Sequence, residues 1–412
     1  MNILFDFLTV WIKTGAGEYQ RRVFFEMLSE LESRNRDDIK IYALYDSGKG
    51  IAYEDLTPQK VFNSYIEFVD CHNKGIDKIV LEKKIDRFFI ASAHYLRDNP
   101  EVADIKCEVI WVNHDFYGEE LYHNKLYLYL FMTHPEGEIP LGITSFPILY
   151  RIPLLKNILS HLDRFSYRYI RYKGNAQYAK YLEHIKPGIQ ILKNNKNTKI
   201  VTVSEYSKVS LNYYFDIPLE KIDVLYSPEK ICVKKKPAHD IDLKILLESK
   251  RKYYVLVSAG LPQKNPFKTL CAFKKYAEHH PDSYLVTLGY KKKEFQNHIC
   301  LSFLDDSDLA LLYENCYALI YPSFFEGFGY PPIEVMHYGK PVLCSNSTSM
   351  PSIYGDAPIY FCPFYESAIY NALLSLTDSN YLKYSKKAID CYQQIHKRQE
   401  EDLKRLIEMI LK

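Results

Sequence analysis

The chain has 412 residues, of which 25% are charged and 47% hydrophobic, and its formal net charge is +2. At about 100–200 residues per domain, the length favours two or three domains, and these proportions exclude a disordered chain, a collagen-like repeat and a coiled coil. A dedicated nucleic-acid binder usually carries a basic excess, so we expect no nucleic-acid partner. The aromatic content is 15%, with 37 tyrosines, which suits an ordinary core first and sugar-stacking or membrane-surface contacts second.

The nine cysteines are widely spaced, and no two of them form a CxxC motif. The odd count and the spacing argue against a disulfide framework and against a zinc site, so we interpret them as buried free thiols in a reducing compartment. The N-terminal segment is too short and too acidic for a signal peptide. No apolar run approaches the length of about 20 residues that spans a bilayer. These features predict a cytoplasmic protein.

Short β-rich segments alternate with helical patterns along the whole chain, which predicts an α/β protein with parallel sheets. In the first half, helices are expected at 18–31 and after Ser204, which is placed as a helix cap. The strands expected there lie at 2–8, 39–44, 86–91, 108–112, 199–203 and 221–226.

Residues 230–240 contain three consecutive lysines followed by Pro237 and show no periodicity, which predicts an interdomain linker. Beyond the linker the alternation resumes, with strands expected at 253–258, 284–288, 299–303, 317–321 and 341–344, and helices at 266–279, 307–315, from Pro332, and from 366 to 412. We therefore expect an N-terminal domain at 1–229, a C-terminal domain at 230–395, and a last helix at 396–412 that returns to the N-terminal domain. Ligands are expected in the cleft between the domains, beyond the carboxyl ends of the strands.

The strongest motif runs from Tyr321 to Glu334, where a buried strand is followed by a Gly-rich loop and a helix with proline in its first turn. Gly327 and Gly329 let the backbone approach a ligand, and the amides of the loop and helix start predict an anion site. Because like charges repel, the Glu326 and Glu334 carboxylates do not suit a phosphate, but they suit the vicinal hydroxyls of a ribose or a hexose. A plain strand–turn–helix with surface glutamates is the alternative.

This stretch resembles retaining glycosyltransferase family 4, whose E-x7-E motif is matched by Glu326 and Glu334. The resemblance covers roughly residues 199–363 with gaps, in the words TVSEYSKVSLNYYFDIPLEKIDVLYSP, FLDDSDLALLYENCYALIYPS, YPSFFEGFGYPPIEVMHYGKPVLCSN and SMPSIYGDAPIYFCP. It implies the GT-B fold, in which two Rossmann-like α/β domains face each other across a cleft, the N-terminal one on the acceptor side and the C-terminal one binding the nucleotide sugar. It also implies that the first Glu contacts the donor sugar and the second the nucleotide ribose. The loop residues counted as donor-binding are Gly327, Phe328, Gly329 and Tyr330.

A second loop, SAGLPQKNP, ends a strand and starts a helix, with Asn265 placed as the helix cap. The Lys264 ammonium and the positive N-terminal end of that helix can together neutralise a diphosphate. Gly260 and Asn265 are counted as donor-binding residues. In the family this loop usually reads G-R-x4-K, whereas here Leu261 follows Gly260. The departure removes a bidentate phosphate partner. A solvated surface lysine is the alternative role for Lys264.

Three features of the N-terminal half join the candidate site. Gly15 and Gly17 lie between the first strand and the first helix, where the family's Gly-rich turn faces the donor phosphates or the acceptor; a turn that merely needs glycines is the alternative. His114 follows a strand and resembles the His of the family's V-H-D segment, which points at the donor sugar; helix capping is the alternative. Ser204 is counted as donor-binding, although the helix cap is its expected role.

The most basic stretch of the chain, 151–186, combines an apolar helical face with several tyrosines. Family members that extend lipid-linked glycans often bind the membrane surface through such helices. The resemblance therefore predicts that this stretch makes a peripheral contact with the inner face of the membrane. A solvated helix pair with snorkelling cations is the alternative.

The sequence thus predicts a retaining, metal-independent glycosyltransferase that moves a hexose from a nucleotide-diphosphate sugar to a glycan or glycolipid in cell-surface polysaccharide biosynthesis. Glu326, Lys264 and His114 are its expected catalytic residues. The wording EGFGYPP resembles that of enzymes that use GDP-mannose, so the resemblance favours this donor, and UDP- and dTDP-sugars stay open. No DxD word is placed for a metal and the resemblance to GT-B enzymes implies metal independence, so no metal and no cofactor beyond the donor is expected. A catalytically weak nucleotide-sugar-binding partner subunit and a nucleotide-sugar epimerase are the alternatives.

Overall fold

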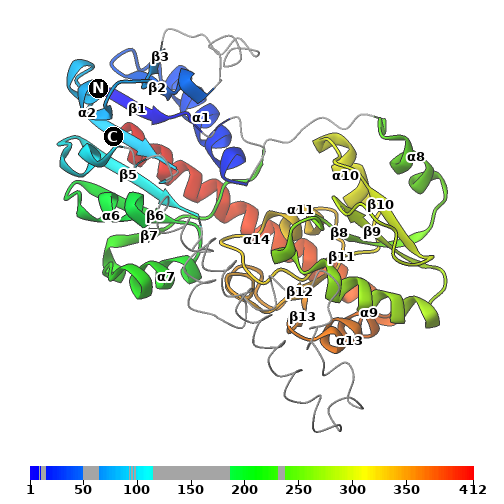
Figure 1. Ribbon diagram of the computed structural model, residues 1–412. Helices are drawn as coiled ribbons and strands as arrows, with labels where there is room; N and C mark the ends of the chain where they lie inside the picture. Colours follow the sequence, from blue (N-terminus) through cyan, green and yellow to red (C-terminus); the bar gives the residue numbers. More distant parts are fainter. Residues whose placement is uncertain are drawn as a thin grey trace, which may run out of the picture. The chain divides into compact units, whose positions relative to one another are not determined.

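The computed structural model describes residues 1–8, 10, 15–49, 65–91, 93, 96, 99–114, 186–230 and 237–412 (Figure 1). The predicted membrane-contact stretch 151–186 lies outside these residues, except for Lys186. The chain divides into two compact units. The described residues of the first unit lie at 1–114, 186–230 and 396–412, and those of the second at 237–395.

The first unit is built on a seven-stranded parallel sheet in the doubly wound order β3-β2-β1-β4-β5-β6-β7. The strands are β1 (Asn2–Asp6), β2 (Lys40–Tyr45), β3 (Ile66–Asp70), β4 (Arg87–Ile90), β5 (Glu108–Asn113), β6 (Thr198–Thr202) and β7 (Ile222–Val224). Its helices are α1 (Gly15–Arg34), α2 (Ile76–Glu82), α6 (Lys186–Asn194) and α7 (Glu205–Phe215). Because both faces of a parallel sheet are covered, its central strands are largely apolar, and Phe88 of β4 and Trp111 of β5 are almost fully buried.

The second unit is built on a six-stranded parallel sheet in the order β10-β9-β8-β11-β12-β13. The strands are β8 (Lys252–Leu256), β9 (Ser283–Leu288), β10 (His298–Leu301), β11 (Ala318–Tyr321), β12 (Val342–Ser345) and β13 (Ile359–Phe361). Its helices are α8 (Ile241–Glu248), η8 (Pro262–Lys264), α9 (Pro266–His279), α10 (Asp306–Asn315), α11 (Tyr330–Met336), α12 (Met350–Tyr354), α13 (Glu366–Ser375) and the start of α14 (Asp378–Leu411). Helices α9 and α13 lie side by side against a core that contains Phe273 and Leu373 (Figure 1).

Helix α14 is attached to both units, because its residues up to Ile395 belong to the second unit and those from His396 to the first. In the second unit the Ser385 hydroxyl donates to the Gly339 carbonyl at 2.6 Å. In the first unit the Tyr226 amide donates to the Asp402 carboxylate at 2.9 Å. The last helix therefore contributes to the packing of both units.

The two parallel sheets confirm the predicted α/β class, and every predicted strand is present to within a few residues. The sequence patterns did not reveal two strands, β3 and β13, or four α-helices, α2, α6, α8 and α12. Eight cysteines lie in the described part of the chain and all are free, but the expected burial is wrong for four of them, Cys71, Cys271, Cys300 and Cys362, which are half-buried. None of the helices formed by the described residues is long and apolar enough to cross a bilayer.

Candidate functional site

The candidate site lies at the carboxyl edge of the second sheet, in the loop that joins β11 to α11. Because the six strands are parallel, the loops that follow β8, β11, β12 and β13 all leave the sheet at this edge. In the first of these loops Lys264 ends η8, and in the second Glu326 precedes the turn into α11. The Lys264 ammonium and the Glu326 carboxylate form an ion pair in which the two side chains are 15% and 13% exposed. Neither residue is a solvated surface group, so that alternative is wrong for both.

The buried strand end completes the surroundings of this ion pair. The Lys264 ammonium also donates to the Tyr321 hydroxyl at 3.4 Å and lies 5.3 Å from the centre of that ring. Burial, and next the nearby Glu326 carboxylate, raise the pKa of Tyr321 well above its ordinary value. Tyr321 therefore stays a neutral hydroxyl that can donate a hydrogen bond next to the two charges.

Residues from the β12–α12 segment hold the backbone of the Glu326 loop. The Glu326 amide donates to the Thr348 hydroxyl at 3.1 Å, and the Ser349 hydroxyl donates to the Glu326 carbonyl at 2.8 Å. The Tyr354 hydroxyl donates to the carbonyls of Phe328, at 3.1 Å, and Gly329. These contacts hold the backbone of the loop, and the ion pair with Lys264 holds the Glu326 carboxylate, before any ligand binds. Catalytic groups need this kind of preorganisation.

Gly329 is the position of this loop at which glycine is required. Its φ of +82° lies in the left-handed region, and an added Cβ would lie 2.7 Å from the Tyr354 hydroxyl. Gly327 and Phe328 lie in the same loop, and Tyr330 is the first residue of α11. The rings of Phe328 and Tyr330 are in edge contact at 5.6 Å, so the loop packs against the start of its own helix.

Glu334 lies on α11, and both of its carboxylate oxygens are buried. Tyr313 of α10 lies next to this carboxylate. Burial first, and then the charge of Glu334 and a hydrogen bond to it, raise the pKa of Tyr313 well above its ordinary value. Glu334 is therefore an interior acid with a tyrosine neighbour, and the interpretation as a surface glutamate is wrong for it also.

Asn265 does not cap helix α9 with its side chain, so that prediction is wrong. It occupies the cap position with a φ of 52° and a ψ of 47°, whereas side-chain capping requires an extended backbone at this position. Its amide instead donates to the Pro363 carbonyl at 2.8 Å and is buried. Asn265 thus joins the loop after β8 to the loop after β13.

In the loop that follows β8, Gly260 is packed against backbone and the Leu261 side chain is exposed to solvent. A Cβ at Gly260 would lie 2.7 Å from the Gly289 carbonyl oxygen, so a side chain there would collide with backbone. Leu261, which stands where the family has arginine, is 46% exposed. The Phe324 amide donates to the Gln263 carbonyl at 3.0 Å and ties this loop to the Glu326 loop.

The remaining predicted site residues lie in the first unit. Helix α1 begins at Gly15 rather than Glu18, so Gly15 and Gly17 belong to its first turn. The His114 ring follows β5 and contacts the Tyr19 ring of α1 edge-on at 4.7 Å. Ser204 caps α7, as expected, by accepting the Ser207 amide at 3.2 Å, and its side chain is fully buried.

Sequence reasoning missed the residues that support these loops. Thr348, Ser349 and Tyr354 received no role, although the polar run SNSTS directly after a strand was the available signal. Asp6 also received no role. It is fully buried at the end of β1 and accepts the Gln20 side-chain amide at 3.1 Å, which fixes α1 to the sheet.

One group of potential metal ligands, His239, Asp305 and Asp308, occurs among the described residues. Asp305 caps α10 by accepting the Asp308 amide at 2.8 Å, and Asp308 accepts the amides of His239 and Asp240 at 3.1 and 2.9 Å. These carboxylates serve local backbone groups, and the cluster contains neither Glu326 nor Glu334.

Comparison with known proteins finds a family match in the second unit. Residues 239–398 match the family model of glycosyl transferases group 1. Over 82 residues, which are 20% of this chain and 22% of the relative, the sequence is 44% identical to O-antigen chain mannosyltransferase B of Escherichia coli. Over 187 residues, 43% of this chain and 50% of the relative, it is 27% identical to O-antigen chain mannosyltransferase RfbU of Salmonella typhimurium. The chain thus matches half or less of the length of these two curated relatives.

A solved structure of Anabaena HepE in complex with UDP is similar to the whole chain. The TM-score is 0.61 at 13% sequence identity, and the alignment covers 100% of this chain and 99% of the other. At this identity the likeness establishes the fold. The protein therefore has the GT-B fold, and its residues 239–398 match the model of glycosyl transferases group 1.

Proposed function

We propose that the protein is a retaining, metal-independent glycosyltransferase of family 4 that transfers mannose from a nucleoside diphosphate to a saccharide acceptor in cell-surface polysaccharide biosynthesis. The observation that carries this proposal is the shielded Lys264–Glu326 ion pair at the carboxyl edge of a sheet within a group 1 domain. The names of the two O-antigen mannosyltransferase relatives support the choice of sugar and of pathway class. We place the protein in the cytoplasm, at the inner face of the membrane.

The ion pair supplies the two charges that the reaction requires. Breaking the bond between a sugar and a diphosphate develops positive charge on the sugar ring and extra negative charge on the leaving group. When the donor binds, the Lys264 ammonium would exchange its partner for the diphosphate, and the Glu326 carboxylate would accept hydroxyls of the sugar. Because the loop backbone is already held by Thr348, Ser349 and Tyr354, little reorganisation accompanies this exchange.

The other residues are assigned by the resemblance to family 4. Glu334 would hold the ribose, and the Gly260 and Gly327–Gly329 backbone would approach the diphosphate. From the first unit, His114 would contact the donor sugar, and the first turn of α1, with Gly15 and Gly17, would contact phosphate or acceptor. The acceptor's proton would pass to the leaving phosphate, so no separate base is assigned.

The experiment that tests this function has a binding arm and a turnover arm. Thermal stabilisation by a panel of GDP-, UDP- and dTDP-sugars identifies the donor, because a ligand that binds the folded state raises its melting temperature. We expect GDP-mannose to give the largest shift. Release of the nucleotide diphosphate is then followed with mannose-terminated acceptors, and the anomeric configuration of the product is read by NMR. An inverted product would contradict the retaining mechanism.

A nucleotide-sugar-binding partner subunit is the second candidate, and the exposed leucine at position 261 is the observation that favours it. Such a protein would be stabilised by the nucleotide sugar and would release no diphosphate with any acceptor. A mock purification from cells that lack the gene is the control for the turnover arm, because diphosphate release in that preparation would reveal a contaminating enzyme.

A further inference from the structure

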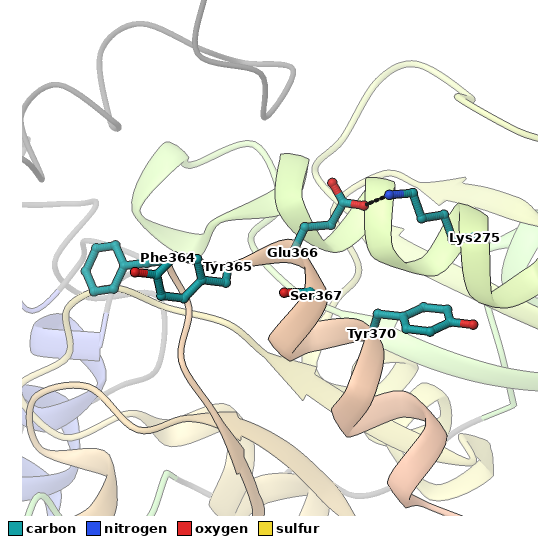
Figure 2. A pocket seen from close by; sticks show the side chains of 6 residues that line it. All are labelled: Lys275, Phe364, Tyr365, Glu366, Ser367 and Tyr370. Atoms are coloured by element: carbon teal, nitrogen blue, oxygen red, sulfur yellow. Dashed lines mark ion pairs between the residues drawn. The ribbon is translucent and has the colours of Figure 1, made fainter.

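The second unit carries a hollow at the start of α13, separate from the Lys264–Glu326 pair (Figure 2). Its volume is about 380 Å³, within the range of about 300–1,000 Å³ that is typical of small-molecule sites. The hollow is lined by Lys275, Phe364, Tyr365, Glu366, Ser367 and Tyr370. None of these residues has a role in the reaction proposed above.

The lining combines aromatic rings with an internally neutralised pair of charges. Tyr365 is 64% exposed, and Phe364 lies beside it on the same loop (Figure 2). The Lys275 ammonium, from α9, pairs with the Glu366 carboxylate at 2.6 Å, and this hydrogen bond raises the pKa of Lys275. The two opposite charges compensate each other, so the pair adds no net charge to the hollow.

This chemistry fits a neutral sugar better than an anion. The C–H faces of a hexose pack on aromatic rings, and its hydroxyls both donate and accept hydrogen bonds. Glu366 supplies acceptors, Lys275 supplies donors, and the exposed Ser367 hydroxyl supplies both. A phosphate would find its cation already paired with a carboxylate and would be repelled by that carboxylate.

The hollow adjoins the candidate donor site through two contacts. The loop after β13, which carries Phe364, leaves the sheet at the same edge as the Glu326 loop. The Phe364 ring lies 5.3 Å from the ring of Phe324, two residues before Glu326. The loop is also fixed to the Lys264 loop by the hydrogen bond from Asn265 to the Pro363 carbonyl.

We propose that this hollow, although it lies on the unit that the resemblance assigns to the nucleotide sugar, is an additional subsite for the acceptor saccharide, which holds a neutral sugar residue away from the reacting end of the chain. The inference rests on the proposed function, because a saccharide acceptor is what that function requires. It assigns Tyr365 as the stacking residue and the Lys275–Glu366 pair as the group that binds hydroxyls. These residues would bind the acceptor without touching the reacting atoms.

The kinetic test compares short and long acceptors with the full-length protein. In the Tyr365→Ala variant we expect the ratio of kcat/KM for a long mannose oligosaccharide to that for methyl mannoside to fall about five- to tenfold, as expected from the loss of one aromatic contact. Turnover of the short acceptor is expected to stay at the wild-type level. Tyr365→Phe keeps the ring and should restore the ratio. Tyr213→Ala, which removes a tyrosine of α7 that is 73% exposed, is the matched control and should leave the ratio unchanged.

A binding test without donor separates this inference from the proposed function. Saturation-transfer NMR with the same mannose oligosaccharide is expected to give a signal with the wild-type protein and Tyr213→Ala, and a strongly reduced signal with Tyr365→Ala. If no donor is turned over but the Tyr365-dependent signal is present, the proposed function fails and the subsite stands. If turnover is present and Tyr365→Ala behaves as wild type in both assays, the subsite is wrong and the function stands.

Discussion

Lys264 and Glu326 lie 62 positions apart in the chain and form an ion pair at the edge of one sheet. Each residue comes from the loop after a different strand, and each loop is held by backbone hydrogen bonds from other segments. The pair is therefore a product of the fold rather than of local sequence. It also keeps two mostly buried charges compensated while the donor is absent, which an unpaired charge in the same place would not achieve.

Replacing Glu326 by glutamine should lower kcat by a factor on the order of 100, because the carboxylate is assigned to the charge that develops on the sugar. Donor affinity should change by only a few-fold, since the diphosphate and the nucleotide provide most of the binding contacts. Diphosphate release gives the rate, and calorimetric titration of the nucleotide sugar gives the affinity. Glu248→Gln, the same change at an exposed site of α8, is the matched control. A Glu326→Gln rate near that of the wild type would remove Glu326 from the mechanism.

Replacing Leu261 by arginine should tighten diphosphate binding. A guanidinium at this exposed position of the loop can form the bidentate phosphate contact that the family has and this chain lacks. We expect the affinity for the nucleotide diphosphate to rise about five- to tenfold at low salt, and the gain to shrink as salt is added. Leu261→Gln controls for the loss of leucine without adding charge. Equal affinities of the arginine and glutamine variants would show that position 261 does not face the phosphates.

Replacing Glu334 by alanine should mainly weaken nucleotide binding, with an increase of about tenfold or more in the dissociation constant, because a lost carboxylate–hydroxyl contact costs about 1.5–3 kcal/mol. Tyr313→Phe separates this effect from general damage to the interior. It removes the hydroxyl that neighbours Glu334 and keeps the carboxylate. If both variants lose stability and neither loses nucleotide affinity, Glu334 serves the packing of α10 and α11 rather than the ribose.

The fold was largely predictable because buried parallel strands are continuous apolar runs. Segments such as 254–256 and 319–321 consist of apolar or aromatic residues, which favours a buried strand, and the structure buries them. The helix predicted at 266–279 has those bounds in the structure. The strand β3, by contrast, has an exposure pattern that is intermediate at most positions, and β13 has only three residues. Neither offers enough apolar periodicity to be recognised.

The candidate site was predictable in its residues but not in its contacts. Lys264 and Glu326 could be selected by motif, whereas their pairing depends on the strand order β8-β11, which no local pattern shows. The left-handed backbone at Asn265 was equally hidden, because asparagine is a favoured cap and is also tolerant of a positive φ. Two chemically reasonable roles competed there, and the tertiary contact with Pro363 determined the outcome.

Replacing Gly329 by alanine should destabilise the second unit by about 1–3 kcal/mol, because the residue has a positive φ and its new methyl group would collide with the Tyr354 hydroxyl. Tyr354→Phe removes that hydroxyl together with its hydrogen bonds to the loop. The double variant should therefore be less destabilised than the sum of the two single variants. Thermal melts of the four proteins give the comparison, and strict additivity would show that the two positions do not interact.

The stability of the second unit should fall in mild acid because of His298, which lies on β10 outside the candidate site. Its side chain is buried, its Nδ1 atom accepts the Glu294 amide at 3.2 Å, and its Nε2 atom is paired with the Thr287 hydroxyl at 2.8 Å. Burial lowers the pKa of His298 from 6.5 to about 4. Between these two pH values the unfolded chain binds the proton and the folded chain does not, so the free energy of unfolding decreases as the pH falls through this range.

The measurement compares urea unfolding of the wild type with that of His298→Gln, which keeps a hydrogen-bonding side chain and has no charge to gain. From pH 7 to pH 5 the wild type should lose about 2 kcal/mol more than the variant, because each pKa unit corresponds to about 1.4 kcal/mol. Because the carboxylates titrate in both proteins, their contribution cancels in the difference between the two free energies of unfolding. Above pH 7 the two profiles should run parallel, since His298 is neutral in both states there. Parallel profiles down to pH 5 would show that the His298 imidazole gains its proton as readily in the folded protein as in the unfolded chain.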